Sequence, residues 1–418
     1  MRVYNPITQR VEPFVPRGKQ ASVYVCGVTP YDTTHLGHAF TYCVFDVLIR
    51  YLEFQGLAVR YVQNVTDIDD DILRKAREVG EDWRALGNRW TAHFIRDMQA
   101  LNVRPPDHYP RATEIIPEIV NVVARLIEKG VAYESGGSVY FHVDAWPEFG
   151  QLSHLPREQM LPIANERGNN PNDPHKRDPL DFVLWQAQAP GEPAWDSPWG
   201  PGRPGWHIEC STMSHHYLGS PIDFHGGGGD LAFPHHECEI AQAEAASGQR
   251  PCVRFWMHAA MVRYAGEKMS KSLGNLVMVN DLMRTWSADG LRLYLAAHHY
   301  RQTWSYAEDE LAAAERRAGL LREAVATQGG NGAAVAAEAA MGAFTAALDD
   351  DLATPAALDA LERLAREVLQ GAQAGRDVRE AQGALRRMGC VFGLRLDAPG
   401  PEKRVIAGWA EHLKRFAD

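Results

Sequence analysis

The sequence predicts an α/β fold: a doubly wound parallel sheet with an inserted subdomain and a C-terminal helical bundle. Residues 22–28 form a short β-branched run typical of a buried strand. Apolar side chains then recur at helical spacing from about residue 38 to Gly56, which is placed to end a helix, and residues 57–65 are typical of a second strand. This strand–helix–strand order is the nucleus of a parallel sheet. From about residue 307 the chain is rich in Ala, Leu, Glu and Arg, which predicts packed helices.

The segments between these regions complete the predicted organisation. Helical spacing recurs over residues 110–130, and sheet-like patterning returns near 221–225 and 252–262. Residues 150–205 lack periodicity; because a structureless connection of this length is rare inside a domain, they predict an inserted subdomain or functional loops. A glycine-rich break at 328–332 divides the helical tail. We therefore predict four segments: the first half of the sheet domain at 1–115, the connective insert at 116–200, the second half at 201–306 and the bundle at 307–418.

The composition is that of an ordinary soluble globular protein, with 45% hydrophobic and 23% charged residues. Without a long apolar run or the apolar core of a signal peptide, we expect a cytoplasmic protein that does not bind membranes. The formal net charge of −10 argues against a large non-specific nucleic-acid surface, although a local basic groove stays possible. Six cysteines in 418 residues do not form a disulfide framework, and we expect Cys43 and Cys390 to be buried small side chains.

Two short motifs suit the handling of phosphates. The first, HLGH at residues 35–38, lies where the first predicted helix begins, and a helix N-terminus presents free N–H groups and partial positive charge to an anion. Its two imidazoles can donate to phosphate oxygens. The second, KMSKS at residues 268–272, brings two lysines and two hydroxyls suited to a polyphosphate. Alone, the first motif is better explained as a glycine turn with two capping or surface histidines, and the alternative for the second is a solvated surface loop that carries two lysines.

As a pair in this order, the two motifs resemble the HIGH and KMSKS signatures of class I aminoacyl-tRNA synthetases. The resemblance implies a Rossmann-like catalytic domain that joins an amino acid to AMP and releases pyrophosphate. It extends from about residue 20 to about residue 360, and four further segments resemble the cysteine-specific branch of the class. These segments are Tyr24–Asp32, Gly205–Cys210, His225–Gly228 and Phe233–Glu239.

The resemblance also implies the site residues. It assigns one Zn²⁺ per chain, which would bind the sulfur of substrate cysteine and so discriminate against serine, because zinc prefers thiolate to hydroxyl. Spacing alone does not identify its ligands, which would be Cys26, Cys210, His235 and Glu239. The implied catalytic residues, acting on ATP with Mg²⁺, are His35, His38, Lys268 and Lys271. Those that bind cysteine are Cys26 and Trp206. Those that bind ATP and the adenylate are Thr29, Leu36, Gly37, Thr41, Asn64, Thr66, Gly228, Asp230, Val262, Met269, Ser270 and Ser272.

Two of these residues have an ordinary structural interpretation as well. Trp206 could be a core aromatic, since tryptophans are usually structural. Asp230, which follows four glycines, could be a turn residue.

The acceptor of the cysteinyl group distinguishes two branches of this family. One branch charges tRNA(Cys); the other, the cysteine ligase of the mycothiol pathway, condenses cysteine with the amine of glucosaminyl-inositol. Pro30 directly after Thr29, the ERGNNP segment at 166–171 (ERGGDP in the ligases) and the end of the chain at Asp418, without a basic anticodon-reading module, resemble the ligase. Glu239 resembles the tRNA enzymes, because ligases usually carry a small or apolar residue there.

We therefore expect a monomeric enzyme that forms cysteinyl-adenylate from ATP and L-cysteine and passes cysteine to a small amine acceptor, glucosaminyl-inositol. The alternative acceptor is tRNA(Cys). A third hypothesis, a non-catalytic regulatory paralogue that binds cysteine and ATP, is disfavoured because such proteins usually lose phosphate-handling residues. Here all four are present: His35, His38, Lys268 and Lys271.

Overall fold

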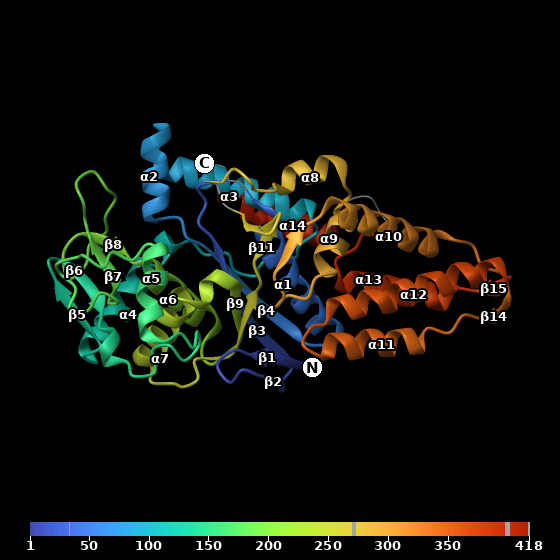
Figure 1. Ribbon diagram of the computed structural model, residues 1–418, viewed down its shortest axis with the longest axis horizontal. Helices are drawn as coiled ribbons and strands as arrows, with labels where there is room; N and C mark the ends of the chain where they lie inside the picture. The colour runs from blue at the N-terminus through green and yellow to red at the C-terminus, as the bar shows by residue number, and fades with distance from the viewer. Residues whose placement is uncertain (33, 270–272, 398–401, 417–418) are drawn as a thin grey trace.

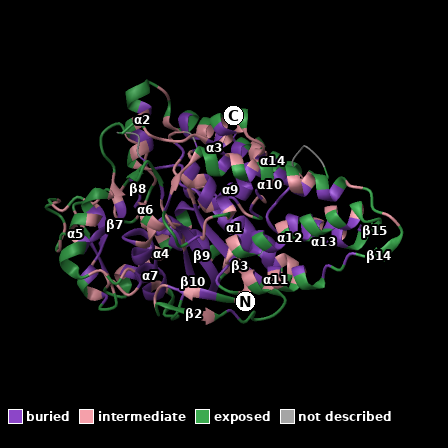
Figure 2. Cartoon of the chain, turned by 45° about the vertical axis from the view of Figure 1, so that its right-hand side comes forward, coloured by how far each residue is buried: buried purple, intermediate pink, exposed green. Residues whose placement is uncertain are grey.

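The computed structural model describes residues 1–32, 34–269, 273–397 and 402–416 of the chain. Figure 1 shows three parts along the long axis: a small sheet with surrounding helices, a central sheet, and a group of long C-terminal helices. Buried positions concentrate in the central sheet and on the helix faces that cover it (Figure 2). Among the described residues, no helix is both long and apolar enough to cross a membrane. The predicted α/β class is confirmed.

The central sheet consists of four parallel strands. They are β3 (Gln20–Val28), β4 (Ala58–Val65), β9 (Ile222–Gly228) and β10 (Val253–Ala259), in the order β10–β9–β3–β4. The helix α1 (Leu36–Phe54) joins β3 to β4, so the predicted strand–helix–strand unit is confirmed. Gly56 follows α1 with φ +86°, a left-handed conformation that favours glycine at the end of a helix.

A four-stranded antiparallel sheet forms much of the insert. Its strands, in sheet order, are β5 (Ala132–Ser135), β6 (Ser138–Phe141), β7 (Phe182–Ala187) and β8 (Gly202–Pro204). The helices α4 (Ile116–Glu128) and α5 (Arg157–Glu166) belong to the same part. The aperiodic residues 150–205 therefore contain a helix and two strands. Since β8 lies just beyond residue 200, that boundary cuts the sheet, and the division into domains stays a prediction.

Two helices beyond the insert, α6 (Trp206–Leu218) and α7 (His235–Ser247), pack against each other beside the central sheet. They carry most of the residues predicted to bind metal. The remaining elements are β1 (Arg2–Asn5), β2 (Arg10–Pro13), α2 (Asp70–Val79), α3 (Trp83–Ala100), β11 (Val262–Tyr264), β12 (Glu267–Lys268), α8 (Val279–Thr285), α9 (Ala288–Ala296), β13 (Trp304–Tyr306), β14 (Gly332–Ala334) and β15 (Arg376–Asp377), with short 3-10 turns at 112–114, 143–145 and 229–232.

Four C-terminal helices pack together. They are α10 (Glu308–Ala326), α11 (Glu338–Asp349), α12 (Thr354–Gln373) and α13 (Arg379–Val391), and the predicted break at 328–332 lies between the first two. The last helix, α14 (Lys403–Lys414), packs instead against α3, and Trp409 Nε1 donates to the Val103 carbonyl at 2.8 Å. The chain therefore returns from the helical bundle to the sheet domain (Figure 1).

The two cysteines expected in the core differ in exposure. Cys43 on α1 is 4% exposed, so its predicted burial is confirmed. Cys390 is exposed, and the prediction that it is buried is wrong. It lies on the same outer face of α13 as Arg387, one turn earlier, which is exposed as well.

A buried charge network ties α1 to the C-terminal region. Asp46 on α1 is 2% exposed and accepts from Arg50 Nε at 2.9 Å and from the guanidinium of Arg292 on α9. Arg50 also donates to Glu402 Oε1 at 2.8 Å, and Arg292 to the Phe392 carbonyl. Burial by itself raises the pKa of Asp46, but the guanidinium groups of Arg50 and Arg292 outweigh it and hold that pKa below its usual range. The helix that carries HLGH is thus braced by paired charges.

We expect Asp46→Asn to lower the free energy of unfolding by about 3–5 kcal/mol at neutral pH, because two buried guanidiniums lose their shared carboxylate. Since the folded-state pKa is lowered, this stabilisation is complete above about pH 4 and is lost as the pH falls through the lowered pKa. Urea unfolding at neutral and acidic pH measures both effects. Asp397→Asn, which removes a surface partner of Arg386, is the control and should cost at most about 1 kcal/mol. Equal costs for the two variants at neutral pH would contradict this role.

Candidate active site and metal centre

The candidate site lies at the carboxyl ends of β3, β4 and β9, the edge where parallel sheets bind ligands. Gly27 N donates to Asn64 Oδ1 at 2.7 Å, and Asn64 Nδ2 donates to Thr66 Oγ1 at 3.2 Å. A side chain at Gly27 would clash, because its Cβ would lie 1.6 Å from the Asn64 carbonyl oxygen. Close approach of β3 and β4 therefore holds Asn64 and Thr66, both predicted adenylate residues, beside the glycine that follows Cys26.

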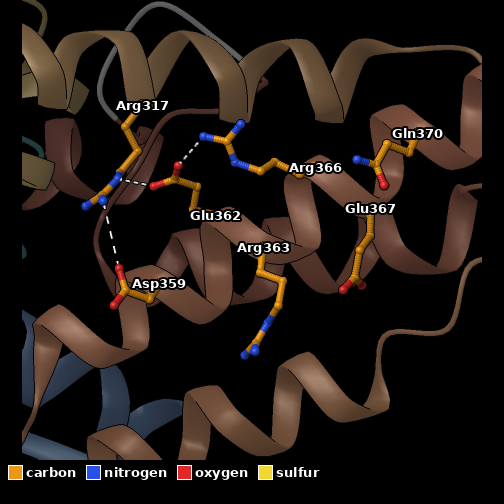
Figure 3. A pocket seen from close by; sticks show the side chains of 7 residues that line it. All are labelled: Arg317, Asp359, Glu362, Arg363, Arg366, Glu367 and Gln370. Atoms are coloured by element: carbon orange, nitrogen blue, oxygen red, sulfur yellow. Dashed lines mark hydrogen bonds and ion pairs between the residues drawn. The ribbon is translucent and has the colours of Figure 1, made fainter.

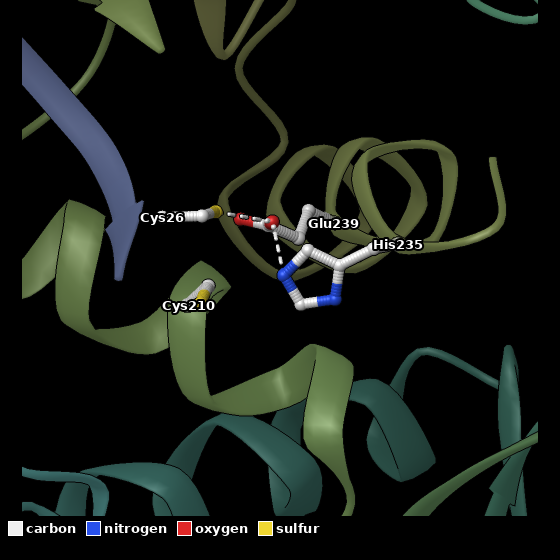
Figure 4. A group of neighbouring side chains, drawn as sticks. All are labelled: Cys26, Cys210, His235 and Glu239. Atoms are coloured by element: carbon white, nitrogen blue, oxygen red, sulfur yellow. Dashed lines mark hydrogen bonds and ion pairs between the residues drawn. The ribbon is translucent and has the colours of Figure 1, made fainter. Parts of the chain in front are cut away.

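The four predicted zinc ligands meet in one buried cluster (Figure 4). Cys26 comes from β3, Cys210 from α6, and His235 and Glu239 from α7, where they are four residues apart. Their donor atoms all lie within 4.8 Å of one another, and each residue is at most 4% exposed. Glu239 Oε1 is 3.0 Å from His235 Nε2 and 3.6 Å from Cys26 Sγ. Two thiols, an imidazole and a carboxylate are donors that zinc prefers.

The electrostatics of the cluster fit a bound dication. Burial raises the pKa of Cys26 and of Glu239 well above their usual ranges. Burial opposes ionisation of Cys210 too, but hydrogen bonding with Cys26 and the nearby His235 outweigh it and lower the Cys210 pKa to about 7. Buried anionic donors without a compensating charge are costly. A metal ion would offset that cost, so the residues present fit zinc.

Two residues of the segment Gly205–Cys210, His207 and Trp206, contact the His235 ring. His207 Nδ1 lies 2.8 Å from His235 Nδ1, which orients the His235 ring so that Nε2 faces the cluster. The Trp206 ring stacks on His235 with centroids 4.3 Å apart and is only partly buried. Trp206 thus lies at the metal cluster. Sequence reasoning did not single out His207, although it lies between Trp206 and Cys210 in a recognised segment.

Three more histidines near the cluster, His225, His236 and His258, were not predicted as site residues from the sequence. Cys26 Sγ is 3.5 Å from His225 Nε2 and 3.3 Å from His236 Nε2. His236 Nδ1 is in turn 2.8 Å from His258 Nε2 on β10. His225 and His236 fall within segments that resemble the cysteine-specific branch, which was the available signal; His258 had none.

The HLGH motif caps α1 through hydrogen bonds to the Nδ1 atoms of both histidines. His35 Nδ1 accepts from Gly37 N at 3.1 Å, and His38 Nδ1 accepts from His35 N at 3.4 Å. The two rings stack with centroids 3.8 Å apart. Because Nδ1 is the acceptor in each neutral ring, Nε2 carries the proton and can donate to a phosphate oxygen. Leu36 is fully buried, so only its backbone can face a ligand.

The described part of the KMSKS segment lies next to this cap. Lys268 ends β12 and is exposed, whereas Met269 is 8% exposed. A Cβ on Gly37 would lie 3.9 Å from Met269 Cε, so Met269 lies against the HLGH turn. Downstream, the Leu36 N–H donates to the Val277 carbonyl at 2.8 Å. The predictions for Ser270, Lys271 and Ser272 lie outside the described residues.

The other predicted adenylate residues differ in what they expose. Gly228 lies between Asp230 and Thr41: a Cβ there would be 2.6 Å from Asp230 Oδ1 and 4.0 Å from Thr41 Oγ1. Asp230 is exposed. Thr29 is partly buried, and Val262 is 2% exposed within the main core. Thr41, Gly228 and Asp230 are therefore brought together, while the Val262 side chain serves packing.

A surface groove of about 540 Å³ lies in the C-terminal helical region, between α10 and α12, and is separate from the candidate active site (Figure 3). Glu362 accepts from Arg317 Nε and from the Arg366 guanidinium, each at 2.6 Å. The walls of the groove therefore carry charged side chains that are paired with one another. The residues that line it are Arg317, Asp359, Glu362, Arg363, Arg366, Glu367 and Gln370.

Comparison with known proteins identifies the family. A model of the class I (C) tRNA synthetase catalytic domain matches residues 14–316. The chain belongs to this family. A DALR domain model matches residues 343–397, within the C-terminal helices. The synthetase match spans the central sheet, the insert, both phosphate motifs and all four members of the metal cluster.

Two relatives in this family show similar degrees of identity. The chain is 49% identical over 375 residues to the L-cysteine:1D-myo-inositol 2-amino-2-deoxy-alpha-D-glucopyranoside ligase of Thermomonospora curvata, covering 89% of each chain. It is 45% identical over 401 residues to the cysteine–tRNA ligase of Dehalococcoides mccartyi, covering 95% of this chain and 86% of the other. The family and these relatives make the chain a cysteine-activating, ATP-dependent ligase of the class I synthetase type.

A solved structure shares the fold at low identity. Methionyl-tRNA synthetase of Mycobacterium tuberculosis, in complex with methionyl-adenylate, matches with a TM-score of 0.64 and 18% identity, covering 95% of this chain and 93% of that one. At this identity the similarity concerns the fold alone.

Proposed function

We propose that the chain joins L-cysteine to the amine of glucosaminyl-inositol in two steps. In the first, the cysteine carboxylate attacks the α-phosphorus of ATP, the bond to the β-phosphate bridging oxygen breaks, and pyrophosphate leaves. In the second, the acceptor amine attacks the carbonyl carbon of cysteinyl-adenylate, the C–O bond to AMP breaks, and the amine loses a proton. The products are the cysteinyl amide, AMP and pyrophosphate.

In this proposal the motif residues stabilise charge on the phosphates. The Nε2–H groups of His35 and His38 donate to oxygens of the α- and β-phosphates at the N-terminus of α1. Lys268 and Lys271, with the Mg²⁺ that accompanies ATP, neutralise the departing pyrophosphate. Cys26, Cys210, His235 and Glu239 would hold zinc, which would supply thiolate-selective binding of the substrate.

The acceptor assignment depends on the segment 166–171, which resembles the ERGGDP motif of the ligases. Arg167 Nη1 donates to the backbone carbonyls of Asp230 and Phe233, on the turn before α7. The same turn brings Asp230 beside Gly228 and Thr41. The ligase-like segment therefore borders the predicted adenylate pocket, where an acceptor has to reach the cysteinyl carbonyl. The 49% identity to the Thermomonospora curvata ligase also supports this assignment.

The direct test offers both acceptors. The enzyme is incubated with ATP, Mg²⁺ and labelled cysteine, with glucosaminyl-inositol in one reaction and bulk tRNA in the other. We expect stable label on the sugar amine, with AMP released in equal amount. Label on tRNA and none on the sugar amine would contradict the proposed acceptor while leaving cysteine activation intact.

Arg167→Ala tests the role of the segment. We expect it to slow transfer to the amine more than it slows cysteine-dependent pyrophosphate exchange, because, among the described residues, Arg167 contacts the turn that carries Asp230 and not the phosphate motifs at 35–38 and 268–272. The control is Arg77→Ala, whose exposed guanidinium pairs with Glu192 on the surface. Equal loss of exchange and transfer in Arg167→Ala would show that the segment does not act on the acceptor.

Glu239 favours the second candidate, a cysteine–tRNA ligase. It is 1% exposed, and its Oε1 atom lies 3.0 Å from His235 Nε2. Ligases usually have a small or apolar residue at this position. The relative from Dehalococcoides mccartyi is nearly as similar as the ligase. The tRNA reaction described above tests this candidate directly.

A further inference from the structure

A second group of four donors overlaps the proposed zinc ligands. Cys26, His225, His236 and Glu239 are all buried, and their donor atoms also lie within 4.8 Å of one another. Cys26 and Glu239 belong to both groups. The first group completes its set with Cys210 and His235; the second completes its set with two imidazoles, one from β9 and one from α7.

The two oxygens of Glu239 face different histidines. Oε1 is 3.0 Å from His235 Nε2, whereas Oε2 is 3.3 Å from His225 Nε2. Cys26 Sγ lies 3.3 Å from His236 Nε2 and 3.5 Å from His225 Nε2. The shared thiol and carboxylate therefore lie between the two groups. Glu239 presents one oxygen to His235 of the first group and the other oxygen to His225 of the second.

The second group is built as a ligand set in two further respects. His258 Nε2, 2.8 Å from His236 Nδ1, orients the His236 ring with Nε2 toward Cys26, as His207 does for His235. In the described part of the chain, Glu239 Oε2 is buried without a hydrogen-bond partner, although it lies 3.3 Å from His225 Nε2. Buried polar atoms are nearly always satisfied, so this carboxylate oxygen favours a cation on the His225 side of Glu239.

We propose that Cys26, His225, His236 and Glu239 form a second position for the zinc ion, one that retains the ion when Cys210 or His235 is lost as a ligand. The inference rests on the proposed zinc site, with which it shares two residues. Thiolate, imidazole and carboxylate are each donors that zinc takes, and cobalt(II) binds the same kinds of ligand as a substitute. Because Cys26 and Glu239 are shared, one ion occupies one position at a time.

Cobalt(II) distinguishes the two positions, because thiolate-to-cobalt absorption depends on how many thiolates bind the ion. The apoprotein and three variants are loaded with Co²⁺ and passed through a desalting column, and bound metal and absorption are then measured. The wild type should hold about one equivalent with the band of two thiolates. Cys210→Ala should also hold about one equivalent, with that band reduced by about half because one thiolate remains.

Two variants control for the position of the ion. His236→Ala keeps the first group whole and should match the wild type, whereas Cys210→Ala combined with His236→Ala should hold no cobalt. Loss of cobalt from Cys210→Ala alone, its retention in the double variant, or two equivalents in the wild type would each overturn the second position. A wild type that binds no cobalt or zinc would instead overturn the proposed zinc site itself. Circular dichroism confirms that each variant is folded.

Discussion

Replacing Cys26 with alanine is expected to empty the metal centre and to abolish discrimination between cysteine and serine. Cys26 is the only thiol common to both groups of donors, and its Sγ lies within 3.6 Å of Glu239, His225 and His236. Without it neither position keeps four ligands. When one partner of a specific polar interaction between a site and its substrate is missing, kcat/KM falls by on the order of 10⁴. We therefore expect a fall of that size in the rate of cysteine-dependent pyrophosphate exchange.

Metal content and exchange are measured on the same preparation. Cys43→Ala is the matched control, because Cys43 is another buried cysteine but lies in the α1 core. It should retain about one equivalent of zinc and near wild-type exchange. Full zinc in Cys26→Ala, or equal zinc loss in both variants, would contradict the role of Cys26.

His38→Ala is expected to slow adenylate formation by about 10²–10³ in kcat while zinc stays bound, because it removes one donor aimed at developing phosphate charge. The Nδ1 atom of His38 also caps the helix by accepting from His35 N. Alanine therefore removes a cap and a donor together, and the cap alone is worth about 1 kcal/mol of stability.

His38→Asn separates these two roles. The Asn Oδ1 atom can replace Nδ1 as the acceptor of the cap, but the side chain cannot place a donor where Nε2–H was. We expect the Asn variant to be as slow as the Ala variant in pyrophosphate exchange and to unfold near the wild-type urea midpoint. Wild-type exchange in both variants would exclude His38 from the reaction.

The fold was predictable where periodicity is local. The strand at 22–28, the helix that ends near Gly56 and the helices after residue 307 each have a hydrophobic pattern that packing preserves. The insert lacked such a signal, because β8 has only three residues and β6 pairs with β7 across a long connection, Phe141 opposite Phe182. Pairing at that distance is decided by tertiary packing.

The metal cluster was predictable only through resemblance. Cys26 and Glu239 are 213 residues apart, and a parallel sheet brings them together through its crossovers, so no local spacing marks them. Supporting side chains such as His207 and His258 were harder still. They contact His235 and His236, and each looks like an ordinary polar residue until those ring contacts are known.

Cysteine activation is tested most directly by ATP–pyrophosphate exchange in the absence of any acceptor, with cysteine and serine compared at equal concentration. Exchange that requires cysteine, fails with serine and disappears when the metal is chelated is the expected result. Exchange with neither amino acid by a folded, zinc-loaded enzyme, or equal exchange with both, would contradict activation of cysteine through a metal-bound thiolate.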